Sequence, residues 1–274
     1  MFIEDLRADV LTTRPILSAA DFAAGWGAVD VLSLPGAAGD RYLIGFAHSD
    51  RSLEAALRLR YEVFNLELNE GLASSIETGL DRDAYDAQMT HLLLIEQTSG
   101  QVVGTYRMQT VEHGLANGGL YSAQEYDVSG LAPYFAESIE LGRACLTAEH
   151  RSMRAIIGLW QGIGAYMNLY GLYYTFGCCS LTSQDPMDGW RALKQIRKKG
   201  YLHESVYLSA LLEYSCGEEV DTETIGLPKL FRTYMKLGTK VVSEPAIDRD
   251  FGTVDFLVML DARVVTFSQL DVVK

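Results

Sequence analysis

The sequence predicts an α/β fold in which helices flank a mixed central sheet. Residues 91–96 and 102–110 are two β-rich segments joined by a short Ser/Gly-containing turn, and this arrangement predicts an antiparallel hairpin. After residue 138, β-rich segments alternate with helical ones, which predicts crossover connections between strands. The chain contains no GxGxxG, GxxxxGK[ST], HExxH or GxSxG motif. The usual sequence signals of nucleotide-loop, zincin and esterase chemistry are therefore missing.

The predicted elements follow in order. Residues 1–40 are rich in Ala and Gly around 19–39 and predict an N-terminal arm, followed by one domain at 41–274. Asp50 to Ser52 supply cap residues for a helix that runs to about Phe64, and a polar, acidic segment at 69–88 predicts a long loop. Outside the hairpin, we expect strands at 41–48, 138–146, 172–179 and 253–260, and helices at 153–170, 190–199 and 228–237.

Charge and cysteine content limit the partners. The chain has 36 acidic and 23 basic residues and a formal net charge of −13, so it repels phosphate backbones and a nucleic-acid partner is not expected. Its four cysteines show no CxxC spacing, which predicts reduced thiols in a reducing compartment and no metal site. The first residues show no secretory signal, and we therefore expect a cytoplasmic protein.

One long stretch, 155–184, contains no charged residue and has to be tested as a membrane span. It includes several glycines, Gln161 and Asn168, and it ends in the strand-like run Tyr173 to Phe176. A buried helix followed by a buried strand explains this composition better than a span does.

Ordered segments of the chain match a known family. The matching segments are LRYEVF (59–64), DAYD (83–86), HLLL (91–94), VGTYR (103–107), ELGR (140–143), LPKL (227–230), YMKLG (234–238) and DRDFG (248–252). With them the chain resembles the GNAT-superfamily N-acyltransferases that form lyso-ornithine lipid, a group often labelled hemolysin-like. It is more distantly similar to acyl-homoserine-lactone synthases and N-acyl amino acid synthases.

The resemblance implies a GNAT-like domain at 41–274. It implies an acyl carrier protein as partner, an acyl-phosphopantetheine thioester as co-substrate and no further cofactor. The acceptor would be the amine of an amino acid, and ornithine is the acceptor that the resemblance favours. The donor would carry a fatty acyl chain, with or without a 3-hydroxyl group. Members that use acetyl-CoA carry Q/RxxGxG/A before the long helix to hold a pyrophosphate, whereas this chain reads RSMRAI at 151–156. That difference favours a carrier protein, although a CoA-dependent acetyltransferase acting on a small amine stays an alternative.

Amide formation from a thioester needs an uncharged amine, and Glu140 is our candidate base. Strand alternation at 138–146 places Glu140 and Gly142 on one face and Arg143 and Cys145 on the other. A buried acid in an apolar strand is costly unless it is used or paired, so a salt bridge from Glu140 to Arg107 or Arg143 is the alternative. Gly142 suggests a bulge, and Cys145 is a second, weaker candidate as an acyl-enzyme nucleophile.

Charged residues on neighbouring elements complete the expected site. The resemblance implies that Arg60, Arg107 and Arg143, with Asp83 and Asp86, form a polar network at the acceptor pocket. Arginine suits this task because its guanidinium binds a carboxylate in a bidentate fork. The alternative is an ion-pair network that only pins the long loop.

A basic segment stands out against the acidic background. Residues 191–199 hold five of the 23 basic residues, and a helix would gather Arg191, Lys194, Arg197 and Lys198 on one broad face. Such a face suits docking of an acidic carrier protein, with His150, Arg151 and Arg154 gripping the pantetheine phosphate. The alternative is a solvated helix whose terminal cations complement its dipole.

Two further alternatives concern the cellular role. The helix expected at 228–237 is amphipathic and basic, which suits peripheral contact with an anionic inner membrane where a lipid product would leave. A lactone-signal or N-acyl amino acid synthase is a neighbouring activity. A secreted membrane-lytic protein is a different class, against which the missing signal sequence argues.

Overall fold

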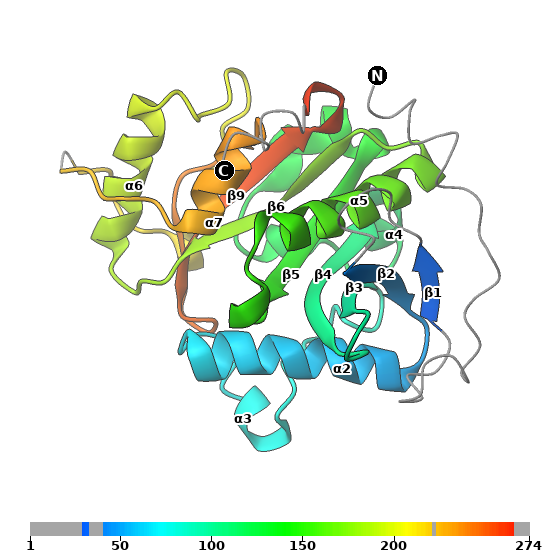
Figure 1. Ribbon diagram of the computed structural model, residues 1–274. Helices are drawn as coiled ribbons and strands as arrows, with labels where there is room; N and C mark the ends of the chain where they lie inside the picture. The colour runs from blue at the N-terminus through cyan, green and yellow to red at the C-terminus, as the bar shows by residue number, and fades with distance from the viewer. Residues whose placement is uncertain (1–28, 33–40, 221–222, 266–274) are drawn as a thin grey trace. The chain divides into compact units, whose positions relative to one another are not determined.

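The computed structural model describes residues 29–32, 41–220 and 223–265. The chain divides into two compact units. Figure 1 labels their main helices and strands. Unit 1 comprises the described residues up to Gln109 and Leu141–Leu172, and unit 2 comprises Thr110–Glu140 and the described residues from Tyr173 onward. Strand β5 (Ser138–Leu146) begins in unit 2 and continues into unit 1. Helices and a mixed set of parallel and antiparallel strands confirm the predicted fold class.

Unit 1 is built on antiparallel strands with a helix on each face. Its strands and helices are β1 (Val29–Leu32), β2 (Tyr42–Ala47), α2 (Asp50–Tyr61), the π-helix η2 (Glu62–Glu67), α3 (Ser75–Thr78), β3 (Thr90–Glu96), β4 (Val102–Thr110), η5 (Ala148–His150) and α5 (Met153–Tyr170). Strands β1 to β4 pair in sequence order, each antiparallel to the next.

The apolar sequence of β3 explains how α5 and α2 pack against its two faces. Leu92 lies so close to Gly162 of α5 that a Cβ there would be 2.7 Å from a leucine methyl carbon. Leu93, on the opposite face by strand alternation, packs with Ala56 of α2. Both faces of β3 are therefore covered, and its sequence reads as a continuous apolar run instead of alternating with polar residues.

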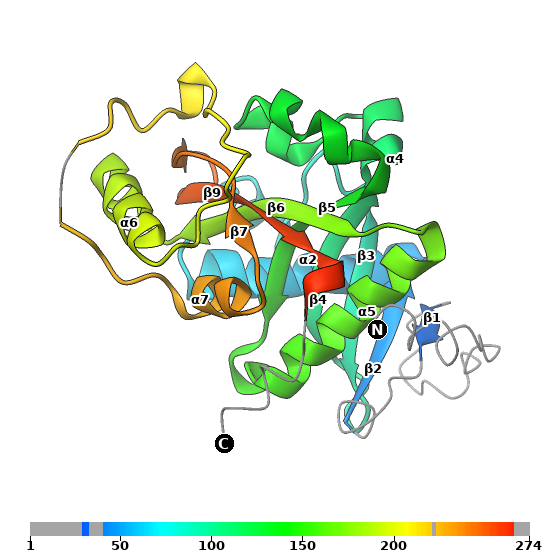
Figure 2. The same ribbon diagram turned by 90° about the horizontal axis from the view of Figure 1, so that it is seen from above.

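Unit 2 contains the remaining elements (Figure 2). They are α4 (Val111–Ala116), η3 (Tyr121–Gln124), η4 (Val128–Glu137), β6 (Tyr174–Leu181), α6 (Pro186–Lys198), η6 (Leu212–Tyr214), α7 (Lys229–Lys236), β7 (Lys240–Val241), β8 (Ala246–Asp248), β9 (Thr253–Asp261) and η7 (Ala262–Val264). The start of β5 pairs parallel with β6, β6 pairs antiparallel with β9, and β7 and β8 both pair with β9.

The two faces of β9 have different neighbours. Phe256 stacks edge to face on Phe231 of α7, so α7 covers that face. Leu257 and Met259 point to the other face, where they form a core with Phe176 and with Leu131 of η4. The segment between α4 and β5 thus covers the second face, which is the face that carries Glu140.

The strands and helices expected from the sequence are present, with shifted ends. Helix α6 begins at Pro186 and not at 190, because Asp185 caps it and proline occupies its first turn. Of the expected N-terminal arm, the structure describes only β1, which pairs with β2, and the rest lies outside the described residues. Among the described helices, none has the length and apolarity needed to cross a membrane.

Candidate active site

Glu140 lies in unit 2, where β5 pairs with β6, and its side chain is 1% exposed. Its carboxylate accepts hydrogen bonds from the backbone N–H of Tyr121 at 3.0 Å, the N–H of Ser122 at 2.7 Å and the Ser122 hydroxyl at 2.6 Å. These donors come from the first turn of η3, where backbone N–H groups have no partner within the helix. The candidate base is therefore held in a fixed orientation by the segment that precedes η4.

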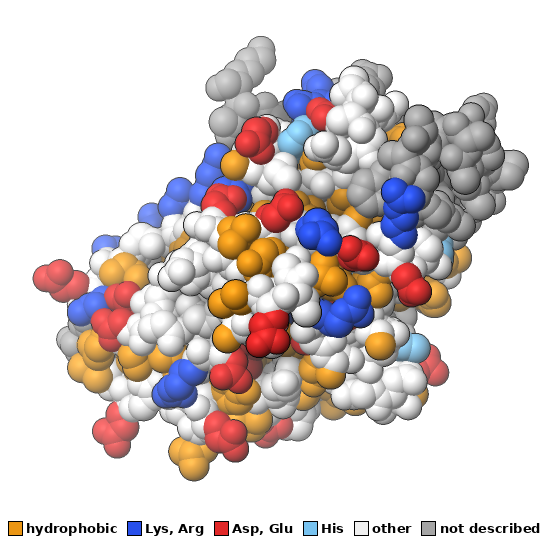
Figure 3. All heavy atoms as spheres, turned by 90° about the horizontal axis from the view of Figure 1, so that it is seen from below, with side chains coloured by type: hydrophobic (Ala, Val, Ile, Leu, Met, Phe, Trp, Pro, Cys, Tyr) orange, Lys and Arg blue, Asp and Glu red, His pale blue; other side chains and the backbone are white. Residues whose placement is uncertain are grey.

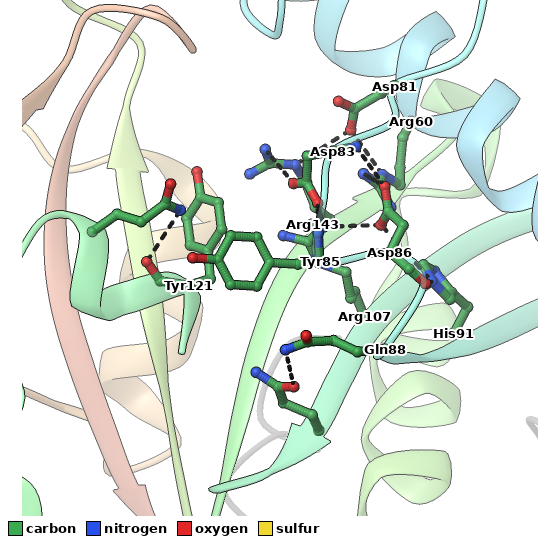
Figure 4. Close-up of polar contacts among 12 residues, drawn as sticks. Arg60, Asp81, Asp83, Tyr85, Asp86, Gln88, His91, Arg107, Tyr121 and Arg143 are labelled. Carbon is green, nitrogen blue, oxygen red and sulfur yellow. Dashed lines mark hydrogen bonds and ion pairs between the residues drawn. The ribbon is translucent and has the colours of Figure 1, made fainter. Parts of the chain in front are cut away.

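In unit 1, three arginines and three aspartates form one buried network (Figure 4). The ion pairs are Arg60 with Asp81 (2.7 Å) and Asp86 (2.7 Å), Arg107 with Asp83 (2.5 Å) and Asp86 (2.8 Å), and Arg143 with Asp81 (3.3 Å) and Asp83 (3.2 Å). The six formal charges cancel, which suits groups removed from water. The network joins α2, β4 and β5 to the loop that the three aspartates occupy.

Arg60 is wholly buried in this network, which favours the alternative that it pins the loop over a direct contact with the acceptor. Its side chain is 0% exposed, and its guanidinium bonds to Asp81 and Asp86 through all three nitrogens. Asp86 is held in the same way, since its carboxylate also accepts the backbone N–H of Asp83. Burial raises the pKa of Asp86, but Arg60 and Arg107 outweigh burial and hold it well below its ordinary value.

Asp83 and Arg143 are more exposed than the other members of this network, whereas Arg107, which pairs with Asp83, is 1% exposed. The Asp83 side chain is 13% exposed and that of Arg143 is 7% exposed. Asp83 also accepts the backbone N–H of Tyr85 at 2.9 Å and so shapes the loop from within. The structure therefore keeps both interpretations of these three residues, as acceptor contacts and as loop anchors.

Sequence reasoning missed two members of the cluster. Asp81 shares its carboxylate between Arg60 and Arg143, and His91 places Nε2 3.1 Å from the backbone oxygen of Asp86. Burial lowers the pKa of His91 to about 4, so its ring is neutral at physiological pH. The signal that was available for His91 is its position as the only polar residue in an otherwise apolar segment at 91–95.

Arg143 interrupts the regular strand geometry. Its φ is +51°, in the left-handed region that non-glycine residues rarely adopt. The expected irregularity near Gly142 is thus centred one residue later, on Arg143. The alternation of side chains between the two strand faces, which the sequence predicted, does not continue past Arg143. Cys145 and Leu146, although adjacent, are both buried. Backbone strain of this kind costs about 1–3 kcal/mol and often accompanies functional sites.

Cys145 is a poor nucleophile in this structure. It is 7% exposed, and burial raises the pKa of its thiol to about 12. A thiol needs to be ionised to attack a thioester, and almost none is at neutral pH. The four cysteines are free thiols, as the sequence predicted.

The expected docking residues fall into different surroundings. His150 is buried and its Nδ1 lies 3.0 Å from the Tyr42 hydroxyl, which argues against the predicted contact with the pantetheine phosphate. Arg151 pairs with Glu67, whereas Arg154 is exposed in the first turn of α5.

On α6, Arg191 pairs with Asp188 at 2.8 Å and Arg197 pairs with Glu219, while Lys194 and Lys198 are exposed. Neighbouring acids therefore neutralise Arg191 and Arg197 on the expected cationic face of α6. On the molecular face drawn in Figure 3, acidic and basic side chains are interspersed with apolar ones.

Comparison with known proteins identifies the family. A model of the acetyltransferase (GNAT) domain matches residues 59–161. The chain is 33% identical over 230 residues to the L-ornithine N(alpha)-acyltransferase of Agrobacterium fabrum, with 78% of each chain covered. It is 32% identical over 232 residues to the protein of that name in Rhizobium meliloti, again with 78% of each covered. The chain belongs to this acyltransferase family.

Membership makes the chain a GNAT acyltransferase, as the resemblance implied. The matched GNAT region contains the Arg60 network and Glu140 together. Among solved structures, an N-acyl amino acid synthase from uncultured soil microbes is a distant neighbour at 12% identity and a TM-score of 0.48, covering 82% of this chain and 92% of that one.

Proposed function

We propose that the protein transfers a fatty acyl group from an acyl carrier protein to the α-amine of ornithine, as a step in aminolipid synthesis. The observation that carries the proposal is the 33% identity over 230 residues to a protein named L-ornithine N(alpha)-acyltransferase. The acyl chain arrives as a thioester on phosphopantetheine. We place the reaction in the cytoplasm, with the basic face of α7 contacting an anionic membrane where the product leaves.

In the proposed reaction, Glu140 takes a proton from the ammonium group of the acceptor. The free amine attacks the thioester carbonyl, a C–N bond forms and the C–S bond breaks. The attacking nitrogen loses a second proton, which passes to the leaving thiolate and gives the free thiol. A general base must lie within hydrogen-bond reach of the proton it removes. The three donors from Tyr121 and Ser122 support this role because they fix the carboxylate before the substrate arrives.

The donor assignment has its own support. Lys194 and Lys198 on α6 and Arg154 on α5 are exposed cations on a chain of net charge −13. Complementary charge steers the encounter with an acidic carrier protein. The sequence before α5 also lacks the glycines with which acetyl-CoA enzymes hold a pyrophosphate.

The direct test is a donor and acceptor comparison with purified protein. The purified protein is incubated with ornithine and either acyl carrier protein or CoA that carries the same 3-hydroxy fatty acyl group. The products are identified by mass spectrometry. We expect N-acyl-ornithine from the carrier-bound donor, at a kcat/KM at least about 100-fold above the CoA donor. Equal rates from the two donors would overturn the donor assignment, and absence of any acylated amino acid would overturn the proposal.

Glu140→Gln tests the base. We expect kcat with ornithine to fall by about 100- to 10,000-fold, because an amide cannot take the proton. Hydroxylamine is uncharged at neutral pH and needs no base, so its acylation by the variant should stay close to wild type. The matched control is Glu137→Gln, the same change at an exposed position three residues earlier. Equal losses with both acceptors would assign Glu140 a purely structural role.

A further inference from the structure

The side chain of Ser122 supplies one of the hydrogen-bond donors around the proposed base. Its Oγ lies 2.6 Å from Oε1 of Glu140, and its backbone N–H donates to the same oxygen at 2.7 Å. The backbone N–H of Tyr121 donates to Oε2 at 3.0 Å. Any residue except proline would provide the two N–H groups, whereas the hydroxyl depends on serine at position 122. The sequence therefore adds a donor that the backbone of this segment alone would not provide.

The contact between Ser122 and Glu140 is buried and short. Both side chains belong to residues that are 1% exposed, so water competes little for the hydrogen bond. A hydroxyl that donates to a carboxylate forms a charge-assisted bond, and 2.6 Å is typical of such bonds. The last torsion of a glutamate side chain has broad energy minima, so the groups that contact its oxygens set the orientation of the carboxylate. Ser122 therefore restricts the rotation of the Glu140 carboxylate.

The core of unit 2 holds Ser122 in place. The backbone N–H groups of Glu125 and Tyr126 donate to its carbonyl oxygen at 3.3 Å and 3.0 Å. Tyr126 is 1% exposed, and its hydroxyl donates to the backbone oxygen of Asp255 on β9 at 2.8 Å. Strand β9 pairs with β6, which pairs with the start of β5, where Glu140 lies. Ser122 and Glu140 are thus attached to the same sheet, and this attachment fixes the distance between them.

A serine in the first turn of a helix usually bonds to its own helix. Helix η3 begins after Leu120, and among the described residues no side chain caps its start. The hydroxyl of Ser122 instead reaches Glu140, which lies 18 positions further along the chain. Local helix capping therefore does not explain the serine, and its contact with the base does.

We propose that Ser122 is a positioning residue, whose hydroxyl holds the Glu140 carboxylate in the orientation that takes a proton from the acceptor. The inference rests on the proposed function, in which Glu140 is the base. A base has to lie within hydrogen-bond reach of the proton it removes, and a small displacement of a catalytic group lowers the rate strongly. Loss of the hydroxyl should therefore slow the proton transfer and leave binding of the acyl donor unchanged.

The test measures Ser122→Ala with two acceptors. With ornithine, kcat should fall by about 10- to 100-fold, the scale of a hydrogen bond to a charged group, and KM for the carrier-bound donor should not change. With hydroxylamine, which needs no base, kcat should stay close to wild type. Ser122→Thr keeps the hydroxyl and should retain most of the kcat with ornithine. The matched control is Ser99→Ala, which removes a serine hydroxyl 2.9 Å from the Glu96 carboxylate in an exposed turn and should leave both rates unchanged.

A double-mutant cycle tests whether Ser122 acts through Glu140. In the Glu140→Gln background the base is already absent, so its orientation no longer affects the rate. Ser122→Ala should then change kcat with ornithine by less than about 2-fold, the scatter expected of independent changes. A full loss in this background would show that the serine acts on something other than Glu140, and it would overturn the inference.

The outcomes separate the inference from the proposed function. If Glu140→Gln loses turnover with ornithine alone while Ser122→Ala keeps the wild-type rate or exceeds it, the inference is overturned and the base assignment stands. Equal losses of Ser122→Ala with both acceptors would also overturn the inference, because they indicate a purely structural role. If Glu140→Gln slows both acceptors equally, the base assignment and the inference fail together. A wild-type enzyme that acylates no amino acid overturns the proposed function itself.

Discussion

Replacing Asp86 by Asn should destabilise unit 1, because this carboxylate joins two arginines of the ion-pair network. Asp86 is 2% exposed and bridges Arg60 at 2.7 Å and Arg107 at 2.8 Å. Asparagine keeps the shape but removes the charge, so three buried arginines would face two carboxylates. Removing one partner of a buried pair costs about 3–5 kcal/mol. For a chain of this size that loss lowers Tm by about 6–20 °C.

The assay is thermal unfolding of wild type and variant over a range of pH. Because the arginines hold the folded-state pKa of Asp86 below its ordinary value of 3.8, the carboxylate stabilises the fold fully above that value. The stabilisation is lost as the pH falls through the folded-state pKa. We therefore expect a constant Tm difference near neutral pH that shrinks on acidification below about pH 4. The control is Glu77→Gln on the exposed helix α3. If the Tm of Asp86→Asn equals that of the Glu77→Gln control at neutral pH, the reasoning is wrong.

Three further predictions concern single groups. The pKa of His91 is about 4 in the fold against an ordinary 6.5, so the unfolded chain protonates first and stability falls from pH 6.5 to pH 4. That loss is about 3 kcal/mol in denaturant titrations, and His91→Gln should lack it. Cys145→Ala should retain turnover, and iodoacetamide should not inactivate wild type at neutral pH. Loss of activity in either case would support Cys145 as the nucleophile. Reversing Lys194 and Lys198 to Glu should raise KM for the carrier-bound donor about 10-fold and leave KM for acyl-pantetheine unchanged. An unchanged KM for the carrier-bound donor at low salt would place docking elsewhere.

Long periodic segments were predictable because the pattern of apolar residues in the local sequence indicates which positions are buried. The run of leucines in β3 and the apolar residues of α5 each cover a face that the structure buries. The elements that escaped prediction are short, such as β7 with two residues and β8 with three. A strand of that length has no measurable period, and only its pairing with β9 makes it a strand.

The candidate site was predictable in composition but not in geometry. Arg60 and Arg107 stood out because charge in core segments is costly. Asp86 lies in a polar loop and was named through the family resemblance alone. Asp81 did not stand out, because it lies in a polar loop and its partners are distant in sequence. The partners of Glu140 are mainly backbone N–H groups, and no residue type reveals which backbone groups will face a carboxylate.

The charge balance of the unit 1 network explains why it can hold the loop in place. Three arginines meet three aspartates, so the six formal charges cancel. Opposite charges stabilise the buried arrangement, because each group satisfies another. An excess of one sign in a buried place is costly on its own. The position of the loop that carries the aspartates therefore depends on every member of the network.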